Sequence, residues 1–313
     1  MILGWTISTL ALLLVGGIVL DAVLGEVRRW HPLIGFGRAA GWLEKSLNAG
    51  RWRAAKGLFA WALAVLPPVA LAAGLTNASG FAAAIVHVLL LYFSLGLRSL
   101  REHTQPIEQA LAQGDLERAR LLTSRIVSRD THHADAGTLA KAAVESLLEN
   151  GNDAVFGTLF WFVVAGGPGA LLFRLANTLD AMWGYRTPRF QAFGRAAARI
   201  DDLLNLVPAR LTALSYALLG DTRRAWLCWR TQAAAWSSPN AGPVMASGSG
   251  ALGLLLGGHA RYDGVDEFRP PLGNGRAAQA EDIGRCWRLV RASVLLWVCV
   301  VGAAGLMERM WHA

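Results

Sequence analysis

The sequence is poor in charged residues, and this scarcity is the first constraint on the class of protein. Asp, Glu, Lys and Arg together make up 17% of the 313 residues, whereas soluble domains average about a quarter. Hydrophobic residues make up 54% of the chain, and its mean hydropathy is +0.35. The composition therefore excludes an ordinary soluble domain and predicts an integral membrane protein.

Several motifs that would indicate other functions are absent. The three cysteines, Cys228, Cys286 and Cys299, form no CxxC pair, so neither a thiolate zinc site nor a redox motif is indicated. No Walker A sequence occurs, so any ATP site is not a P-loop. The net charge of +8 is not arranged as a basic stripe with interleaved aromatics, which argues against a nucleic-acid surface. A GxGxxG match at Gly248–Gly253 follows no predicted strand, so we attribute it to close helix packing.

Long apolar stretches define the expected fold. Four are long enough to cross a membrane: residues 1–24, 57–75, 81–97 and 290–307. The first has no basic n-region, which favours a retained span over a cleaved signal peptide. We predict an all-α, polytopic integral membrane protein that forms a single domain over residues 1–313.

A broken apolar segment, residues 154–176, interrupts the middle of the chain at Gly166–Gly169, with the sequence GGPG. The segment could cross the membrane once, but a break of this kind favours a re-entrant helical hairpin that returns both ends to one side. Residues 98–128 predict a pair of amphipathic helices, and the Gly- and Pro-rich residues 261–284 predict a loop.

The distribution of basic residues predicts the topology. Seven of the 30 Lys and Arg residues lie in 25–56, seven in 98–153, nine in 174–230, and none in the turn 76–80. By the positive-inside rule, the turn faces outward and the site region 98–289 faces the cytoplasm.

Polar residues gather between residues 129 and 210, beside the apolar segments. Lys141, Glu145, Glu149 and Asp153 follow one another at four-residue spacing, which places them on one helical face. A solvated face with a Lys–Glu pair would explain this stripe. However, its three carboxylates repel one another, and a bound metal or polyamine would relieve that repulsion.

A second acidic cluster is the DDxxN sequence of Asp201, Asp202 and Asn205. Oxygen ligands at this spacing suit Mg²⁺ that bridges phosphate oxygens, although an interfacial helix with Arg–Asp pairs would also explain them. We predict Mg²⁺ ligands among the carboxylates of both clusters, namely Glu149, Asp153, Asp201 and Asp202.

Five arginines accompany these carboxylates: Arg186, Arg189, Arg195, Arg199 and Arg210. A guanidinium group binds phosphate or carboxylate through two donors, whereas anchoring at the membrane surface would need only a positive charge.

Together these motifs resemble the adenosylcobinamide-phosphate synthase family of cobalamin biosynthesis, over almost the whole chain. The resemblance rests on four blocks in one order. They are Asp21, Gly25, His31-Pro32 and Gly35; Arg129–Thr131 and Glu145–Asp153; Asn177–Met182, Gly184–Arg186, Phe193-Gly194 and Ala198–Arg210; and Ser238–Gly242, Leu256–Gly258 and Tyr262–Gly264.

The resemblance implies an amide ligation that uses ATP and Mg²⁺ in the bacterial inner membrane. It would join adenosylcobyric acid, a corrinoid, to (R)-1-amino-2-propanol or its O-phosphate. Association with other cobalamin-assembly membrane enzymes and homo-oligomerisation are further expectations.

The family motifs also imply the site residues. The catalytic candidates are Asp130, Glu145, Glu149, Asp153 and Asp180. The substrate-binding candidates are His31, Arg129, Asn150, Asn177, Tyr185, Arg186, Arg189, Asn205, Arg210, Ser238 and Asn240. We expect Asn177, Asp180, Arg186 and Arg210 to share one pocket, in which the arginines hold anionic groups.

Two other classes stay open on the residues alone. An intramembrane prenyltransferase could use the acidic clusters to hold Mg²⁺ on a diphosphate, but it would need more full spans. A transporter or membrane sensor could place the GGPG break at a site in the middle of the membrane. Ionisable residues within the spans would indicate it, and Arg174, Asp180 and His87 are the few candidates.

Overall fold

A computed structural model describes residues 5–27, 31–77, 80–262 and 264–312. The chain divides into two compact units, each built from segments that are far apart in the sequence. Unit 1 contains Met1–Leu97, Asp153–Asn205 and Val298–Ala313, and unit 2 contains Arg98–Asn152 and Leu206–Trp297. The sequence predicts a single domain, and nothing in its composition marks this division.

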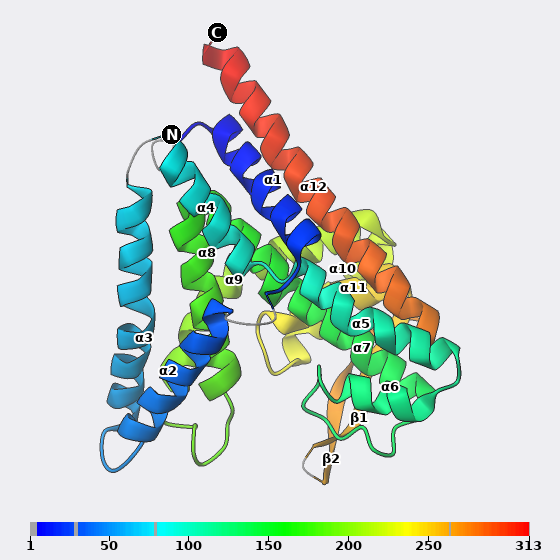
Figure 1. The fold of residues 1–313 in the computed structure, drawn as a ribbon. Coiled ribbons are helices and arrows are strands. Elements are labelled where there is room, and N and C mark those ends of the chain that lie inside the picture. The colour runs from blue at the N-terminus through cyan, green and yellow to red at the C-terminus, as the bar shows by residue number, and fades with distance from the viewer. Residues whose placement is uncertain (1–4, 28–30, 78–79, 263, 313) are drawn as a thin grey trace. The chain divides into compact units, whose positions relative to one another are not determined.

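The all-α class is confirmed, because 75% of the structure is helical. Unit 1 holds α1 (Ile7–Leu24), α2 (Pro32–Leu47), α3 (Arg53–Thr76), α4 (Phe81–Ser94) and α8 (Gly157–Trp183) (Figure 1). Unit 2 holds α6 (Leu116–Thr123), α7 (Ala136–Asn150), α10 (Thr222–Gln232), η2 (Ala233–Ala235) and α11 (Ala241–Leu252). The remaining helices continue from one unit into the other: α5 (Leu97–Ala112), η1 (Gly151–Phe156), α9 (Arg195–Leu219) and α12 (Ala280–His312).

The chain is a multi-pass membrane protein. Within the described residues, five helical stretches are long and apolar enough to cross a membrane: Ile7–Leu24, Arg53–Thr76, Phe81–Ala112, Ala136–Trp183 and Ala280–His312. Three of the predicted spans fall within these stretches. The predicted span 1–24 begins six residues before Ile7, and its residues 1–4 lie outside the described part of the chain. The remaining stretch, Ala136–Trp183, contains the GGPG break.

The chain reverses direction inside α8. The backbone leaves the helical region at Ala165 and Gly166, where Gly166 has φ of 63° and ψ of −154°, a conformation that favours glycine. A Cβ atom on Gly169 would clash with the carbonyl of Trp161, yet in a straight helix these residues would lie about 12 Å apart along the axis. The two halves of α8 therefore fold back on each other, and the sidedness of this hairpin in a membrane stays a prediction.

A histidine from another helix caps the break. The backbone N–H of Gly167, at the start of the second half of α8, donates a hydrogen bond of 2.8 Å to Nδ1 of the buried His87 on α4. Pro168 follows, and proline is well tolerated in a first helical turn because it needs no N–H partner there. The sequence thus builds a half-helix that starts inside an apolar environment.

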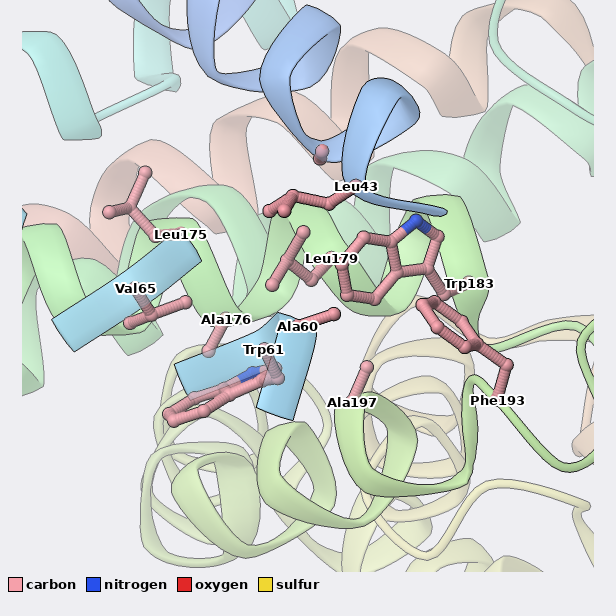
Figure 2. Packing of buried hydrophobic residues seen from close by; sticks show 11 residues of the cluster. Leu43, Ala60, Trp61, Val65, Leu175, Ala176, Leu179, Trp183, Phe193 and Ala197 are labelled. Atoms are coloured by element: carbon pink, nitrogen blue, oxygen red, sulfur yellow. The ribbon is translucent and has the colours of Figure 1, made fainter. Parts of the chain in front are cut away.

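One hydrophobic cluster joins four helices of unit 1. Its side chains come from α2, α3, α8, α9 and the segment before α9 (Figure 2). Trp183 and Phe193 pack edge to face, with ring centroids 5.1 Å apart. This cluster fixes the C-terminal half of α8, which carries Asn177 and Asp180, against the start of α9.

In unit 2 the structure confirms the predicted helix pair as α5 and α6, and it corrects the predicted loop over 261–284. That region forms β2 (Val265–Gly273), β3 (Arg276–Ala277) and the start of α12, and β1 (Leu254–Tyr262) precedes it. β1 pairs antiparallel with β2 and parallel with β3 in the order β2-β1-β3. Pro270 and Pro271 are tolerated because β2 is an edge strand.

The GxGxxG match has the packing role that the sequence indicates. A Cβ atom on Gly248 would lie 2.5 Å from the side chain of Leu148 on α7, and one on Gly250 would lie 2.8 Å from the backbone of Ala225 on α10. The glycines therefore let α11 approach both helices closely.

Candidate functional site

The best-defined polar site in unit 2 is built around Glu145 of α7, which is only 2% exposed. Arg129 forms an ion pair with its carboxylate, and Arg269 of β2 donates to both carboxylate oxygens at 2.8 and 3.1 Å. The backbone N–H of Gly257 donates to the same carboxylate at 2.8 Å. A solvated acidic face is therefore the wrong interpretation of the stripe at this residue.

A bulge in β1 makes the Gly257 contact geometrically feasible. The strand register shifts between Leu256 and Gly258, and Gly257 has φ of 77°. A Cβ atom there would clash with the carbonyl of Pro270. The carbonyl of Gly257 also accepts a hydrogen bond of 2.8 Å from Nζ of Lys141. The Leu256–Gly258 block thus ties the sheet to the polar face of α7.

A cavity of about 150 Å³ adjoins the carboxylate of Glu145. Its lining includes residues from motifs far apart in the sequence, namely Ser128, Arg129, Glu149, Asn150, Tyr262 and Arg269. Nη1 of Arg129 and Nε of Arg269 are buried and have no hydrogen-bond partner among the described residues. A buried donor without a partner costs about 1–3 kcal/mol, so an anion in this cavity would be stabilised by two guanidinium groups.

The other side chains predicted near this cavity have structural contacts. Asn150 donates to the carbonyl of Ser146 at 2.9 Å. The side chain of Asp130 accepts from the backbone N–H of His132 at 2.9 Å, and this bond holds the pKa of Asp130 below its ordinary value. The backbone N–H of Asp130 donates to the carbonyl of Arg261 in β1 at 2.8 Å. These contacts fix the turn that carries Arg129.

A second and larger cavity in unit 2, of about 490 Å³, lies beside Arg210. Nη1 of Arg210 donates to Oδ1 of Asn240 at 2.5 Å. The hydroxyl of Ser238 accepts from the backbone N–H groups of Asn240 and Ala241, at 3.3 and 3.1 Å. Ser238 and Asn240 therefore shape the start of α11, and Asn240 also positions Arg210.

Unit 1 contains a buried carboxylate held by amides. Oδ1 of Asp201 accepts from Asn177 at 3.2 Å and Oδ2 from Asn205 at 3.1 Å, so the predicted shared helix face of Asp201 and Asn205 is confirmed. Burial raises the pKa of Asp201 to about 6, although both amides favour its ionised form. Burial also raises the pKa of Asp202, and the charge of Arg186 opposes this effect.

A third polar group surrounds Arg174 of α8 in unit 1. The negative charges of Glu26 and Asp153 act on Arg174, and its Nε is buried without a hydrogen-bond partner in the described part of the chain. Nδ1 of His31 accepts from the backbone N–H of Leu33 at 3.2 Å and caps α2. Burial lowers the pKa of His31, and the charge of Arg174 acts in the same direction.

The remaining candidates lie at the end of α8 and beyond it. The backbone carbonyl of Asp180 accepts from Gly184 at 2.6 Å. Tyr185 is exposed. Arg189 donates to both oxygens of Glu44, at 3.0 and 2.5 Å, so its guanidinium is engaged by a carboxylate of α2. The predicted pocket of Asn177, Asp180, Arg186 and Arg210 draws on both units and stays a prediction.

Comparison with known proteins identifies the family of the chain. The family described as CobD/Cbib protein matches residues 14–290. The chain is 57% identical to "Cobalamin biosynthesis protein CobD" of Stutzerimonas stutzeri, over 92% of this chain and 95% of the relative.

Other relatives carry the same name. The protein of Chromobacterium violaceum is 52% identical over 97% of this chain and 99% of its own length. That of Mycobacterium tuberculosis is 39% identical over 93% and 92%, respectively. The chain belongs to the CobD/Cbib protein family. The resemblance inferred from the motifs is thereby confirmed. No solved structure shows significant similarity to the chain.

The structure places three residues near the Glu145 cavity that were not among the site candidates predicted from the sequence. Arg269 lies in the segment predicted as a loop, so no pattern connected it with Glu145. Tyr262 belongs to a motif block but was not among the site candidates. Trp236 packs against Arg269, whose guanidinium lies 5.3 Å from the centre of the indole ring. The sheet brings Tyr262 and Arg269 to the cavity beside Glu145, and Trp236 reaches it through Arg269.

The predicted metal ligands need a separate test of fit. Within the described residues, no group of three or more His, Cys, Asp or Glu side chains is placed to hold a metal ion. Both oxygens of Asp201 already accept hydrogen bonds, which makes it a poorer ligand than the half-buried Asp202. The donors fit an ion held by one or two carboxylates and completed by substrate phosphates, which is common for Mg²⁺.

Proposed function

We propose that this protein catalyses an ATP-dependent amide ligation in cobalamin biosynthesis. It would join the free propionate of adenosylcobyric acid to (R)-1-amino-2-propanol or its O-phosphate, giving adenosylcobinamide or its phosphate. The proposal rests on the family and on the small cavity beside Glu145. The observation that carries it is the pair of buried guanidinium N–H groups, on Arg129 and Arg269, that lack partners among the described residues of that cavity.

The cavity suits one anionic group of a substrate rather than a whole corrinoid. Its volume of about 150 Å³ is below the roughly 300–1,000 Å³ of typical small-molecule sites. A carboxylate or a phosphoryl group would accept from Arg129 and Arg269. Charge that develops on that group in the transition state would then meet donors already in position, because Glu145 holds both arginines.

The reaction needs two steps, and each makes a demand on the protein. In the first step, a carboxylate oxygen of the propionate attacks the terminal phosphorus of ATP, and ADP leaves. In the second, the amine nitrogen attacks the acyl carbon, inorganic phosphate leaves, and a proton passes from nitrogen to a base. Glu149 lines the cavity and is our candidate for that base.

Mg²⁺ would neutralise charge on the transferring phosphoryl group. Glu149, Asp153, Asp201 and Asp202 remain the proposed ligands, with Asp202 favoured over Asp201 by the hydrogen bonds described above. Amide substitution of each residue tests the assignment. Wild-type turnover in all four variants would refute it.

The decisive experiment measures ATP consumption by the purified, detergent-solubilised protein. We expect turnover only when cobyric acid and the aminopropanol derivative are both present. The corrinoid product should gain the mass of the amine less one water. Hydrolysis of ATP without the amine, or no change in corrinoid mass, would contradict the proposed ligation.

If the site faces the cytoplasm, Ser128 and Arg189 should lie on the same side of the membrane. Single cysteines introduced at Ser128 and Arg189, in a background without native cysteines, should react with a membrane-impermeant reagent from the same side. Labelling from opposite sides would contradict both the re-entrant hairpin and the single cytoplasmic site.

A further inference from the structure

The larger cavity of unit 2 has a lining with two kinds of side chain. Trp229 and Trp236 offer aromatic faces, and Arg210 and Arg230 offer guanidinium groups. The rest of the described lining is Ala233, Ala234, Ser237, Pro239 and Pro243, and it includes no acidic residue. Its volume of about 490 Å³ lies within the range of small-molecule sites.

This cavity and the one beside Glu145 meet at one pair of side chains. Trp236 lines the larger cavity, and Arg269 lines the smaller one. The guanidinium of Arg269 lies over the indole ring of Trp236 at 5.3 Å, a geometry typical of cation–π contact. A ligand in the larger cavity would therefore lie one side chain away from the anion site.

We propose that the larger cavity binds a nucleoside triphosphate, with the base against Trp229 and Trp236 and the phosphates on Arg210 and Arg230. This inference rests on the proposed function, because it assigns a place to the ATP that the ligation consumes. Aromatic faces and arginines suit a purine ring that carries phosphates. A corrinoid is considerably larger than a nucleotide and fits this volume poorly.

The charge of Arg210 supports the assignment. Burial lowers the pKa of Arg210 below its ordinary value, because the protein removes part of the water around its guanidinium. Its Nη1 is held by neutral oxygens, those of Asn240 and the carbonyl of Leu206. A phosphate oxygen would supply the negative charge that these neutral partners do not.

The test measures equilibrium binding of radiolabelled ATP to the solubilised full-length protein, without corrinoid or amine. We expect Trp229→Ala and Arg230→Ala each to raise the Kd at least about tenfold, or roughly 1.4 kcal/mol. Trp229→Phe should keep most of the affinity because it keeps an aromatic face. The matched controls are Leu227→Ala and Arg223→Ala, which change exposed residues of the same helix outside the cavity. Both controls should bind like wild type.

The outcomes separate this inference from the proposed function. Unchanged ATP affinity in both cavity variants would overturn the site while ligation by wild-type protein stands. Normal ATP affinity with weakened corrinoid binding would assign the cavity to the corrinoid and would also overturn the inference. If wild-type protein bound ATP in this way but made no corrinoid amide, the proposed function would fail and the nucleotide site would remain. Size-exclusion profiles of all variants should match wild type.

Discussion

Glu145 in unit 2 and Asp201 in unit 1 are both buried carboxylates, but the protein holds them by different means. Glu145 has two guanidinium groups and a backbone N–H around it. Asp201 has the neutral amides of Asn177 and Asn205. Charged donors can offset the loss of hydration of an ionised carboxylate, whereas neutral donors offset only part of it.

This difference suggests different chemistry at the two places. Two arginines hold the single carboxylate of Glu145, both of them line a cavity, and each has a buried N–H group without a partner among the described residues. Such a site is organised for a second anion. With its pKa raised to about 6, Asp201 is organised to change protonation state near neutral pH. The first arrangement favours substrate binding, and the second favours a response to pH.

The largest expected effect comes from removing the charge that holds the arginines. Glu145→Gln leaves Arg129 and Arg269 buried without a counter-charge, which typically costs about 3–5 kcal/mol. Thermal unfolding in detergent should show a large drop in melting temperature. Glu281→Gln, at a residue with a 68% exposed side chain, is the control and should melt close to wild type. Equal melting of Glu145→Gln and wild type would show that the arginines do not depend on this acid.

The next effect tests the pH response of Asp201. Its pKa is about 6 in the folded protein and near 3.8 ordinarily, so the folded state binds the proton more tightly. The contribution of Asp201 to the free energy of unfolding is therefore fully present below about pH 4. It is lost as the pH rises towards 6, by up to about 3 kcal/mol. Asp201→Asn does not titrate, and Asn177 or Asn205 can rotate its amide to suit it. Its melting temperature should lose this slope between pH 4 and 6.

The exposed Asp266 of β2 provides the comparison for that experiment. Asp266→Asn should melt with the same pH slope as wild type. Suppose instead that the change of melting temperature with pH persists in Asp201→Asn but disappears in another carboxylate variant. That result would show that the other carboxylate, and not Asp201, causes the pH dependence.

A third prediction concerns the geometry of the arginines beside Glu145. Arg129→Lys and Arg269→Lys keep the positive charge but lose the planar donors. We expect kcat/KM to fall at least about tenfold, or roughly 1.4 kcal/mol of transition-state stabilisation. Arg125→Lys changes an exposed arginine close in the sequence and should keep full activity. Near-normal kinetics in both cavity variants would show that these arginines only balance the negative charge of Glu145.

The smallest effect should come from one amide at Asp201. Asn177→Ala removes a hydrogen bond that favours the ionised carboxylate, at a cost of about 1 kcal/mol above pH 6. The pH midpoint of the melting-temperature curve should move upward, because ionisation becomes harder. A downward movement would contradict the assignment of the amides as stabilisers of the charged form.

The sequence predicted the helical membrane fold because the length of an apolar segment is a local property. It also predicted the helix face shared by Asp201 and Asn205, since helical spacing is fixed. It could not predict that Arg269 meets Glu145, because that contact joins a strand to a helix that lies 124 positions earlier in the sequence. The Gly257 bulge that completes the contact has no signature apart from two adjacent glycines.

The region around β2 shows why the predicted loop was wrong. Glycine and proline usually mark turns, and residues 261–284 contain several of both. Here Pro270 and Pro271 lie in an edge strand, where a missing N–H costs little. The burial of Glu145 was missed for a related reason, because a charged stripe on a helix is ordinarily solvated.

The histidine cap at the break in α8 also fixes the position of a proton. Because Nδ1 of His87 accepts from Gly167, the ring must be the neutral tautomer that carries its hydrogen on Nε2. A second proton would turn the acceptor into a donor facing another donor, and the first turn of the half-helix would lose its cap. The folded-back shape of α8 therefore depends on an uncharged imidazole supplied by α4.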